Sequence, residues 1–146
     1  MNRQNTLKIA KCLCGGIKIK IKGKLRNVFN CHCLQCTKTH GNYASYTACK
    51  DDNLIFLNKR TLKWYKSSSK AKRGFCNKCG ASIFYKITAK RIGNRDLHIS
   101  AGMFKKPLKL KTIANIYIKS KLDYYKLDKS IPKFKREPKT YYPSLK

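Results

Sequence analysis

The chain has 146 residues, 35 lysines and arginines against 6 acidic residues, and a formal net charge of +29. This length suits a single domain with a moderate core, so its eight cysteines are not needed as disulfides merely to stabilise the fold. No stretch approaches 18 apolar residues and the N-terminus lacks the apolar region of a signal peptide, so we expect no membrane span and a cytoplasmic protein with reduced thiols.

Apolar and polar residues alternate along much of the chain, which is the period of a half-buried strand. The clearest case is Ile17–Ile21, where isoleucines alternate with lysines. A short helical turn is expected near Cys33–His40, and residues 67–74 (SSSKAKRG) are expected to form a polar loop. No window of helical length carries an amphipathic stripe, so the expected fold class is all-β. Further strands are predicted at Tyr43–Cys49, Leu54–Leu57, Leu62–Tyr65, Ser82–Thr88, Leu97–Ala101, Leu108–Leu110 and Ile116–Ile118.

Seven of the eight cysteines fall into three tight clusters, CLCGG at 12–16, CHCLQC at 31–36 and FCNKCG at 75–80. Thiolates bind zinc strongly. A structural zinc site takes four protein ligands, whereas a catalytic site keeps one position open. Seven thiols divide into four and three, and the clusters therefore predict two zinc ions per chain.

The knuckle formed by Cys76 and Cys79 supplies only two ligands, and Gly80 permits the tight turn that directs both sulfurs inward. The pair Cys12 and Cys14 is the expected partner, which would give a closed structural zinc site. This site would link the N-terminal hairpin to the middle of the chain. The spacing also admits another closed site, in which the knuckle pairs with CHCLQC.

Three thiols, those of Cys31, Cys33 and Cys36, remain for a site with an open position, which is what a Lewis-acid site requires. His32 is an alternative fourth ligand there, although it lies between two ligands and is expected to point away. The other isolated candidates are given structural roles: Cys49 is expected as a small core residue, and His40 and His98 as surface or strand histidines.

The basic charge would attract anions, nucleic acid included. Lysine greatly outnumbers arginine, and this favours a compositional origin over a specific DNA-reading site, which would use the bidentate arginine fork. Any nucleic-acid binding is therefore expected to be non-specific. Residues 1–129 are expected to form the zinc-binding domain, and residues 130–146, with three prolines and many lysines, an irregular basic tail.

Four segments, CLCGG, CHCLQCTKTHG, RGFCNKCGASIF and ISAG, stand in a familiar order and spacing. Five single positions agree with the same pattern: Lys38, Gly41, Arg73, Phe75 and Gly80. The chain therefore resembles the glutathione-dependent formaldehyde-activating enzyme (Gfa) family, which also includes centromere protein V. The resemblance runs from about Leu7 to Phe134.

This resemblance implies a β-tent fold, in which small antiparallel sheets surround zinc sites. It implies a carbon–sulfur lyase that forms S-hydroxymethylglutathione from formaldehyde and a small thiol, glutathione. The implied ligands are Cys12, Cys14, Cys76 and Cys79 for a structural zinc, and Cys31, Cys33 and Cys36 for a catalytic-type zinc.

The chain departs from the family pattern in the segments expected on the substrate side. Met103–Lys106 replaces an aliphatic residue followed by an acidic one, Asn115 replaces a common histidine, and Tyr124 or Tyr125 replaces a tryptophan. Three functions follow from these observations: a zinc enzyme for a thiol adduct, which we favour, a basic module for nucleic acid, and a structural zinc domain. The last requires a fourth ligand at the second site, His32 or Cys49.

Overall fold

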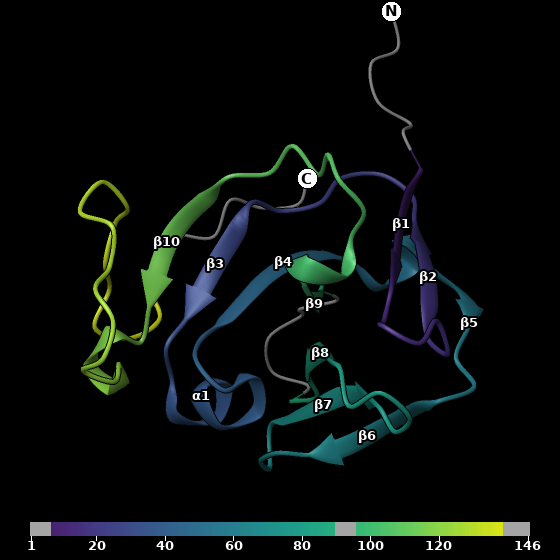
Figure 1. Cartoon of the computed structure of the whole chain (residues 1–146), viewed down its shortest axis with the longest axis horizontal. Helices are drawn as coiled ribbons and strands as arrows, with labels where there is room; N and C mark the ends of the chain where they lie inside the picture. Colours follow the sequence, from purple (N-terminus) through teal and green to yellow (C-terminus); the bar gives the residue numbers. More distant parts are fainter. Residues whose placement is uncertain (1–6, 90–95, 139–146) are drawn as a thin grey trace, which may run out of the picture.

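The structure is a computed structural model that describes residues 7–89 and 96–138, and within these it is mostly β. In these two described stretches, ten strands form two open sheets, and one short α-helix follows the third strand (Figure 1). The strands are β1 Lys8–Lys11, β2 Lys18–Ile21, β3 Val28–Cys31, β4 Ala44–Lys50, β5 Leu54–Asn58, β6 Leu62–Lys66, β7 Ala71–Cys76, β8 Ser82–Ile87, β9 Asp96–Ser100 and β10 Thr112–Ile116. The helices are α1 Leu34–His40 and the 3₁₀ turns η1 Asp51–Asn53, η3 Ala101–Met103 and η4 Ile118–Ser120.

The smaller sheet has the strand order β1-β2-β5 and the larger one the order β10-β3-β4-β9-β8-β7-β6. All paired neighbours are antiparallel except β10 and β3, which run parallel. Figure 1 shows the smaller sheet on one side of the molecule and the larger one curving away from it. The all-β prediction is therefore confirmed, as is the helical turn near Cys33–His40.

Two apolar clusters form the core, and each contains cysteines of a different group. The first gathers Ile19 and Ile21 of β2 with Phe84 of β8, and it includes Cys12 and Cys76. The second gathers side chains of β3, β4 and β10, and it includes Cys31 and Cys36. Each buried isoleucine or phenylalanine contributes about 1.5–3 kcal/mol relative to exposure. The thiols are thus built into the packing of the two clusters.

Three sequence expectations are wrong in detail. Residues 71–74 of the expected polar loop belong to β7, because Arg73 turns its charge into the interior and only residues 67–70 make the turn. No strand forms at Leu108–Leu110, where Lys109 has a φ of 55° that an extended strand does not admit. The strand expected at Ile116–Ile118 stops at Ile116, since Tyr117 is left-handed with a φ of 58°.

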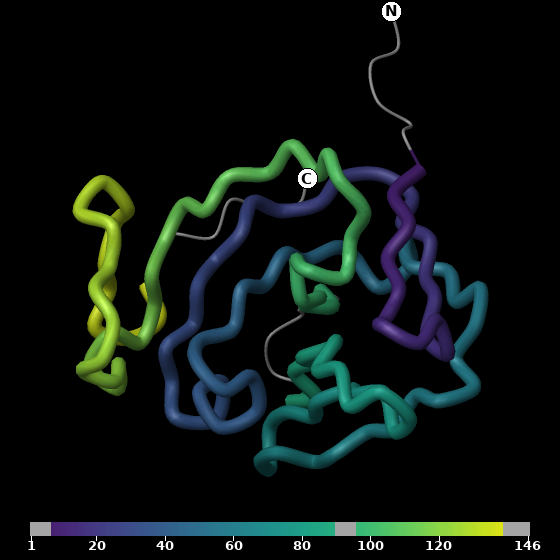
Figure 2. Tube along the Cα trace, in the orientation of Figure 1, coloured from purple at the N-terminus to yellow at the C-terminus, as the bar shows by residue number. Residues whose placement is uncertain are grey.

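The described part of the C-terminal segment runs beside β10 (Figure 2). Asn115 of β10 donates its N–H to the Pro132 carbonyl at 2.8 Å and accepts from the Phe134 N–H at 2.9 Å. Ile118 N–H then donates to the Phe134 carbonyl at 3.1 Å. This pairing carries the chain onward to Glu137. Residues 139–146 of the expected basic tail lie outside the described residues.

Candidate metal centres

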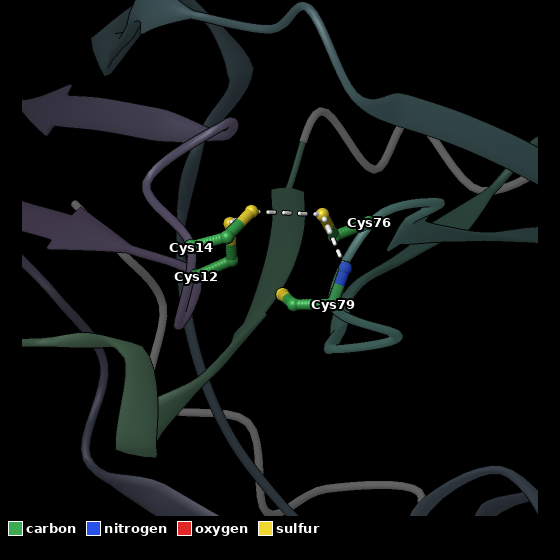
Figure 3. A group of neighbouring side chains, drawn as sticks. All are labelled: Cys12, Cys14, Cys76 and Cys79. Carbon is green, nitrogen blue, oxygen red and sulfur yellow. Dashed lines mark hydrogen bonds between the residues drawn. The ribbon is translucent and has the colours of Figure 1, made fainter.

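Four cysteine thiols from distant parts of the chain converge at the junction of the two sheets (Figure 3). They come from the turn after β1 and from the knuckle that ends β7, and all four sulfurs lie within 4.8 Å of one another. The sulfurs of Cys12 and Cys14 are 3.7 Å apart, and those of Cys14 and Cys76 are 3.6 Å apart. The knuckle therefore pairs with Cys12 and Cys14, and the alternative pairing with CHCLQC is not what the fold forms.

These distances fit a tetrahedral metal site. Four sulfurs at the usual zinc–sulfur distance of about 2.3 Å lie about 3.8 Å apart along each edge of the tetrahedron. Disulfide sulfurs would lie about 2.05 Å apart, and all eight cysteines of the chain are free. The donor set therefore suits a soft metal ion such as zinc.

The backbone around this four-thiol group points N–H groups at the sulfurs. Ile17 N–H donates to Cys12 Sγ at 3.3 Å, and Cys79 N–H donates to Cys76 Sγ at 3.4 Å. The turn requires Gly80, whose φ of 75° favours a residue without Cβ. The Thr61 hydroxyl lies 3.0 Å from Cys76 Sγ. Such donors stabilise sulfur in the thiolate form that binds metal.

A second group, the thiols of Cys31, Cys33 and Cys36, lies where β3 passes into α1. Cys33 caps the helix, since its Sγ accepts the Cys36 N–H at 3.4 Å. Hydrogen bonds from the thiols of Cys31 and Cys36 lower the pKa of Cys33. Among the described residues, no fourth cysteine, histidine or carboxylate joins these three sulfurs. This three-thiol group can hold a metal ion while leaving a coordination position for another molecule.

His32 faces away from the three-thiol group although it lies between two of its cysteines. Its Nε2 is 2.9 Å from Asn115 Oδ1 and its Nδ1 is 2.5 Å from the Tyr125 hydroxyl, and the side chain is fully buried. Because Asn115 Oδ1 only accepts, Nε2 carries the proton and Nδ1 accepts from Tyr125. Both ring nitrogens are engaged, so His32 supports the loop rather than adding a ligand. Cys49, fully buried in the first cluster, belongs to neither thiol group.

Arg73 is the charged residue in closest contact with the three-thiol group. Its two terminal nitrogens lie 3.8 and 3.7 Å from Cys36 Sγ. The same guanidinium donates to the Tyr46 hydroxyl and to Gln35 Oε1, both at 3.3 Å, and its carbon lies 5.0 Å from the Tyr85 ring centroid. A buried arginine held in this way offsets the negative charge of clustered thiolates.

The three-thiol group opens into a pocket of about 470 Å³ on the inner face of the larger sheet. Much of its wall is apolar or aromatic. Its polar atoms come from buried side chains such as Arg26 and Arg73 and from exposed ones such as Glu137. The wall includes Phe29, Tyr85, Ile116 and Tyr117 besides the three cysteines, Arg26, Arg73, His98 and Glu137. The four-thiol group contributes nothing to this wall. The chemistry available to a small molecule is therefore on the three-thiol side.

The family can be identified from these two groups and from the order of the segments that build them. The model of the glutathione-dependent formaldehyde-activating enzyme family matches residues 8–120. The chain belongs to this family. It is also similar to an uncharacterized lyase of Schizosaccharomyces pombe, with 29% identity over 114 residues that cover 78% of this chain and 80% of the relative.

Within the family, the departures of this chain lie away from the pocket wall. Phe104 pairs with Ala10 of β1, and Met103 packs against the first apolar cluster, so this segment faces the smaller sheet. Asn115 and Tyr125 contact His32 behind the three-thiol group. The unusual segments therefore support the two thiol groups from outside and do not form the inner surface of the pocket.

Sequence reasoning missed most of the polar pocket wall. Arg26, His98 and Glu137 lie far apart in the chain, and none belongs to a cysteine motif. Two weak signals existed: Arg26 is one of few arginines in a lysine-rich chain and lies in the partly apolar stretch LRNVF, and Glu137 is its only glutamate. The sequence pattern predicted His98 on a strand, but its position at the pocket depends on the pairing of β9.

In the described part of the chain, no helix is long and apolar enough to cross a membrane.

Proposed function

We propose that the chain is a zinc-dependent protein of the carbon–sulfur lyase type that acts on a thiol–aldehyde adduct. In this proposal Cys12, Cys14, Cys76 and Cys79 hold a structural zinc, and Cys31, Cys33 and Cys36 hold a second zinc at the pocket. The observation that carries the proposal is the pocket itself, because three convergent thiols without a fourth protein ligand among the described residues line a cavity of about 470 Å³. Family membership supports glutathione and formaldehyde as the reactants.

The reaction forms one carbon–sulfur bond. The substrate thiolate attacks the aldehyde carbon, the carbonyl electron pair moves to oxygen, and that oxygen takes a proton to give the hydroxymethyl thioether; the reverse reaction breaks the same bond. A zinc ion bound by three thiolates would lower the pKa of a thiol at its open position.

The residues around the reactants supply charge balance and exclude water. Arg73 sets a fixed positive charge beside Cys36, where negative charge from the thiolates accumulates. Tyr46 receives a hydrogen bond from Arg73, and burial raises the pKa of Tyr46, so it stays a neutral hydroxyl. Phe29 and Ile116 cover the wall with apolar surface, which strengthens these electrostatic interactions.

Cobalt substitution tests this proposal, because thiolate-to-cobalt charge-transfer bands report each added sulfur. Glutathione should intensify the bands of the native chain, and Cys33→Ser should abolish that response while the spectrum of the four-thiol group persists. Cys49→Ala is the matched control, since Cys49 belongs to neither group. Exchange NMR should then show faster exchange between formaldehyde, glutathione and their adduct than in the protein-free reaction. If no thiol perturbs the second metal, the lyase proposal fails and a structural role for both metals takes its place.

Non-specific nucleic-acid binding is a second candidate, favoured by the exposed aromatic residues of one edge strand. Trp64 and Tyr65 are consecutive in β6 and lie on its opposite faces, where both are exposed. The Lys72 amino group lies 4.5 Å from the Trp64 ring centroid. Aromatic faces with lysines suit stacking on single-stranded bases and contact with phosphates. Fluorescence anisotropy should show an affinity for single-stranded DNA that falls steeply with salt and is weaker in Tyr65→Ala. The equally exposed Tyr124, changed to alanine, is the control. Equal loss in both variants would count against β6 as the contact.

A further inference from the structure

The end of the pocket formed by Arg26 carries a buried guanidinium with unused hydrogen-bonding capacity. Arg26 is 5% exposed, lies 3.9 Å from the Phe29 ring centroid, and donates one hydrogen bond, from Nη2 to the Tyr46 carbonyl at 3.4 Å. Its Nη1 has no hydrogen-bond partner in the described part of the chain. Burial lowers the pKa of Arg26 to about 10. A buried cation of this kind is costly unless an anion or acceptor meets it.

A second polar atom without a partner lines the same pocket. His98 Nε2 is shielded from water and makes no hydrogen bond within the described residues, while the ring edge faces Tyr46 and Tyr85. Burial, followed by the charge of Arg26, lowers the pKa of His98 to about 3, so the ring is neutral at pH 7. A neutral imidazole with its proton on Nε2 is a hydrogen-bond donor. Arg26 Nη1 and His98 Nε2 are thus unpartnered buried atoms of residues that line one cavity, and Arg73 Nε beside the three-thiol group is a third.

A carboxylate enters this pocket from the C-terminal segment. Pairing with β10 holds residues 132–135 in place, and Glu137 follows with its Oε2 accepting from the Tyr117 hydroxyl at 3.4 Å. The Glu137 side chain is exposed at the rim of the pocket, and its partial burial raises the pKa of its carboxyl group. Its negative charge and the positive charge of Arg26 influence each other, although Asp96 acts more strongly on Arg26. Among the described residues, no hydrogen bond or ion pair joins Glu137 to Arg26. The salt bridge found there is between Lys86 and Asp51. Opposite charges therefore line one apolar pocket without neutralising each other by direct contact.

We propose that this end of the pocket binds the α-amino-acid group of the thiol substrate. Arg26 Nη1 and His98 Nε2 would donate to its carboxylate, and Glu137 would accept from its ammonium group. A zwitterion fits such a pair of charges better than a simple acid or amine, because each end gains a charge-assisted hydrogen bond and the net charge of the pocket is unchanged. This inference rests on the lyase-type function proposed above, and it narrows the substrate to a thiol that carries a free α-amino acid.

Two thiol classes carry this group: free cysteine, and γ-glutamyl thiols such as glutathione. The test measures binding to the zinc-loaded full chain by isothermal titration calorimetry, with two matched probe pairs. Cysteine is compared with 3-mercaptopropionate, and glutathione with glutaryl-cysteinyl-glycine; each second member lacks only the ammonium group. The pair with the larger difference identifies the class. Removing the ammonium group should weaken binding about tenfold or more, as expected for loss of one charge-assisted hydrogen bond.

Variants connect that preference to named atoms. Glu137→Gln should erase the difference within the preferred pair, whereas Asp123→Asn, an exposed acidic residue, should leave it unchanged. Arg26→Met should weaken every carboxylate-bearing probe while leaving cysteamine unaffected. Arg26 is buried, and its replacement can destabilise the fold. If Arg26→Met does not fold, Glu137→Gln alone tests the amino-acid site.

S-methylcysteine separates this inference from the lyase proposal, because it has the α-amino-acid group and no free thiol. If thiols bind but neither probe pair shows a difference, the amino-acid site is overturned and the lyase proposal stands. If S-methylcysteine binds as tightly as cysteine and Glu137→Gln weakens both equally, the amino-acid site stands and a metal-bound thiol is overturned.

Discussion

The two thiol groups have the same chemistry but different relations to the fold. The four-thiol group joins residues 62 positions apart, Cys14 and Cys76, and ties the smaller sheet to the larger one. The three-thiol group comes from six consecutive residues, 31–36, and opens into a pocket. Distant ligands convert metal binding into folding energy, whereas local ligands leave the metal available to a ligand. Whether a thiol group stabilises the fold or binds a ligand therefore depends less on its number of sulfurs than on which parts of the chain it connects.

The sharpest test of this difference is a serine at one position in each group. Cys76→Ser should prevent cooperative folding, because a structural zinc contributes on the order of 10 kcal/mol, comparable to the whole stability of a domain. Cys36→Ser should give a folded chain that carries one zinc. Thermal melts and native mass spectrometry under reducing conditions measure both. The assignment is reversed if Cys36→Ser is the variant that collapses.

Arg73 should matter to the three-thiol group only. Arg73→Met removes the donor to Gln35 Oε1 and one of the two hydrogen-bond partners of the Tyr46 hydroxyl, the other being His40, and should cost about 1–3 kcal/mol of unfolding free energy. It should also weaken metal binding at the three-thiol group, since the positive charge next to Cys36 is lost. Urea unfolding and cobalt spectra of both groups check this, with the exposed Arg60→Met as control. An altered spectrum of the four-thiol group would contradict the separation.

Acid should act on the pocket side through His98. The folded-state pKa of His98, about 3, lies below the unfolded value of about 6.5, so the unfolded chain binds more protons between these values. This contribution to stability is complete above about pH 6.5 and is lost as pH falls, by about 2 kcal/mol at pH 5. The stability of His98→Gln should therefore fall less steeply than that of the native chain between pH 7 and pH 5. Equal slopes in urea unfolding would show that the ring is not buried neutral.

The smallest expected effects come from deleting one hydroxyl at each group. Thr61→Val removes the donor to Cys76, and Tyr125→Phe removes the donor to His32. Each should cost about 1 kcal/mol in urea unfolding. Thr61→Val should shift the cobalt spectrum of the four-thiol group alone, and Tyr125→Phe that of the three-thiol group alone. A shift of both spectra by either variant would indicate that the two groups are coupled.

The strands with a clear alternation could be predicted from the sequence, and β7 could not. In Ile17–Ile21, side chains of opposite polarity face opposite sides, so the period of two is visible. In β7 the letters of Ala71–Gly74 look polar, but Arg73 is buried and Lys72 lies over Trp64. The charge of these residues therefore hid a strand. The strand predicted at Leu108–Leu110 is the opposite error. Its alternating leucines look like a strand, but both pack against the first apolar cluster without pairing with another strand.

The sequence by itself determined which residues can bind metal, because thiol spacing within a turn is a local property. It predicted the clusters at 12–14, 31–36 and 76–79 and the all-β class. Only the tertiary structure decided which clusters meet, that His32 turns toward Asn115, and that Arg26, His98 and Glu137 share one pocket. The physical reason is sequence separation. Strand pairing across the sheet and the burial of charged groups depend on contacts between residues far apart in the chain, and a local sequence pattern does not specify these contacts.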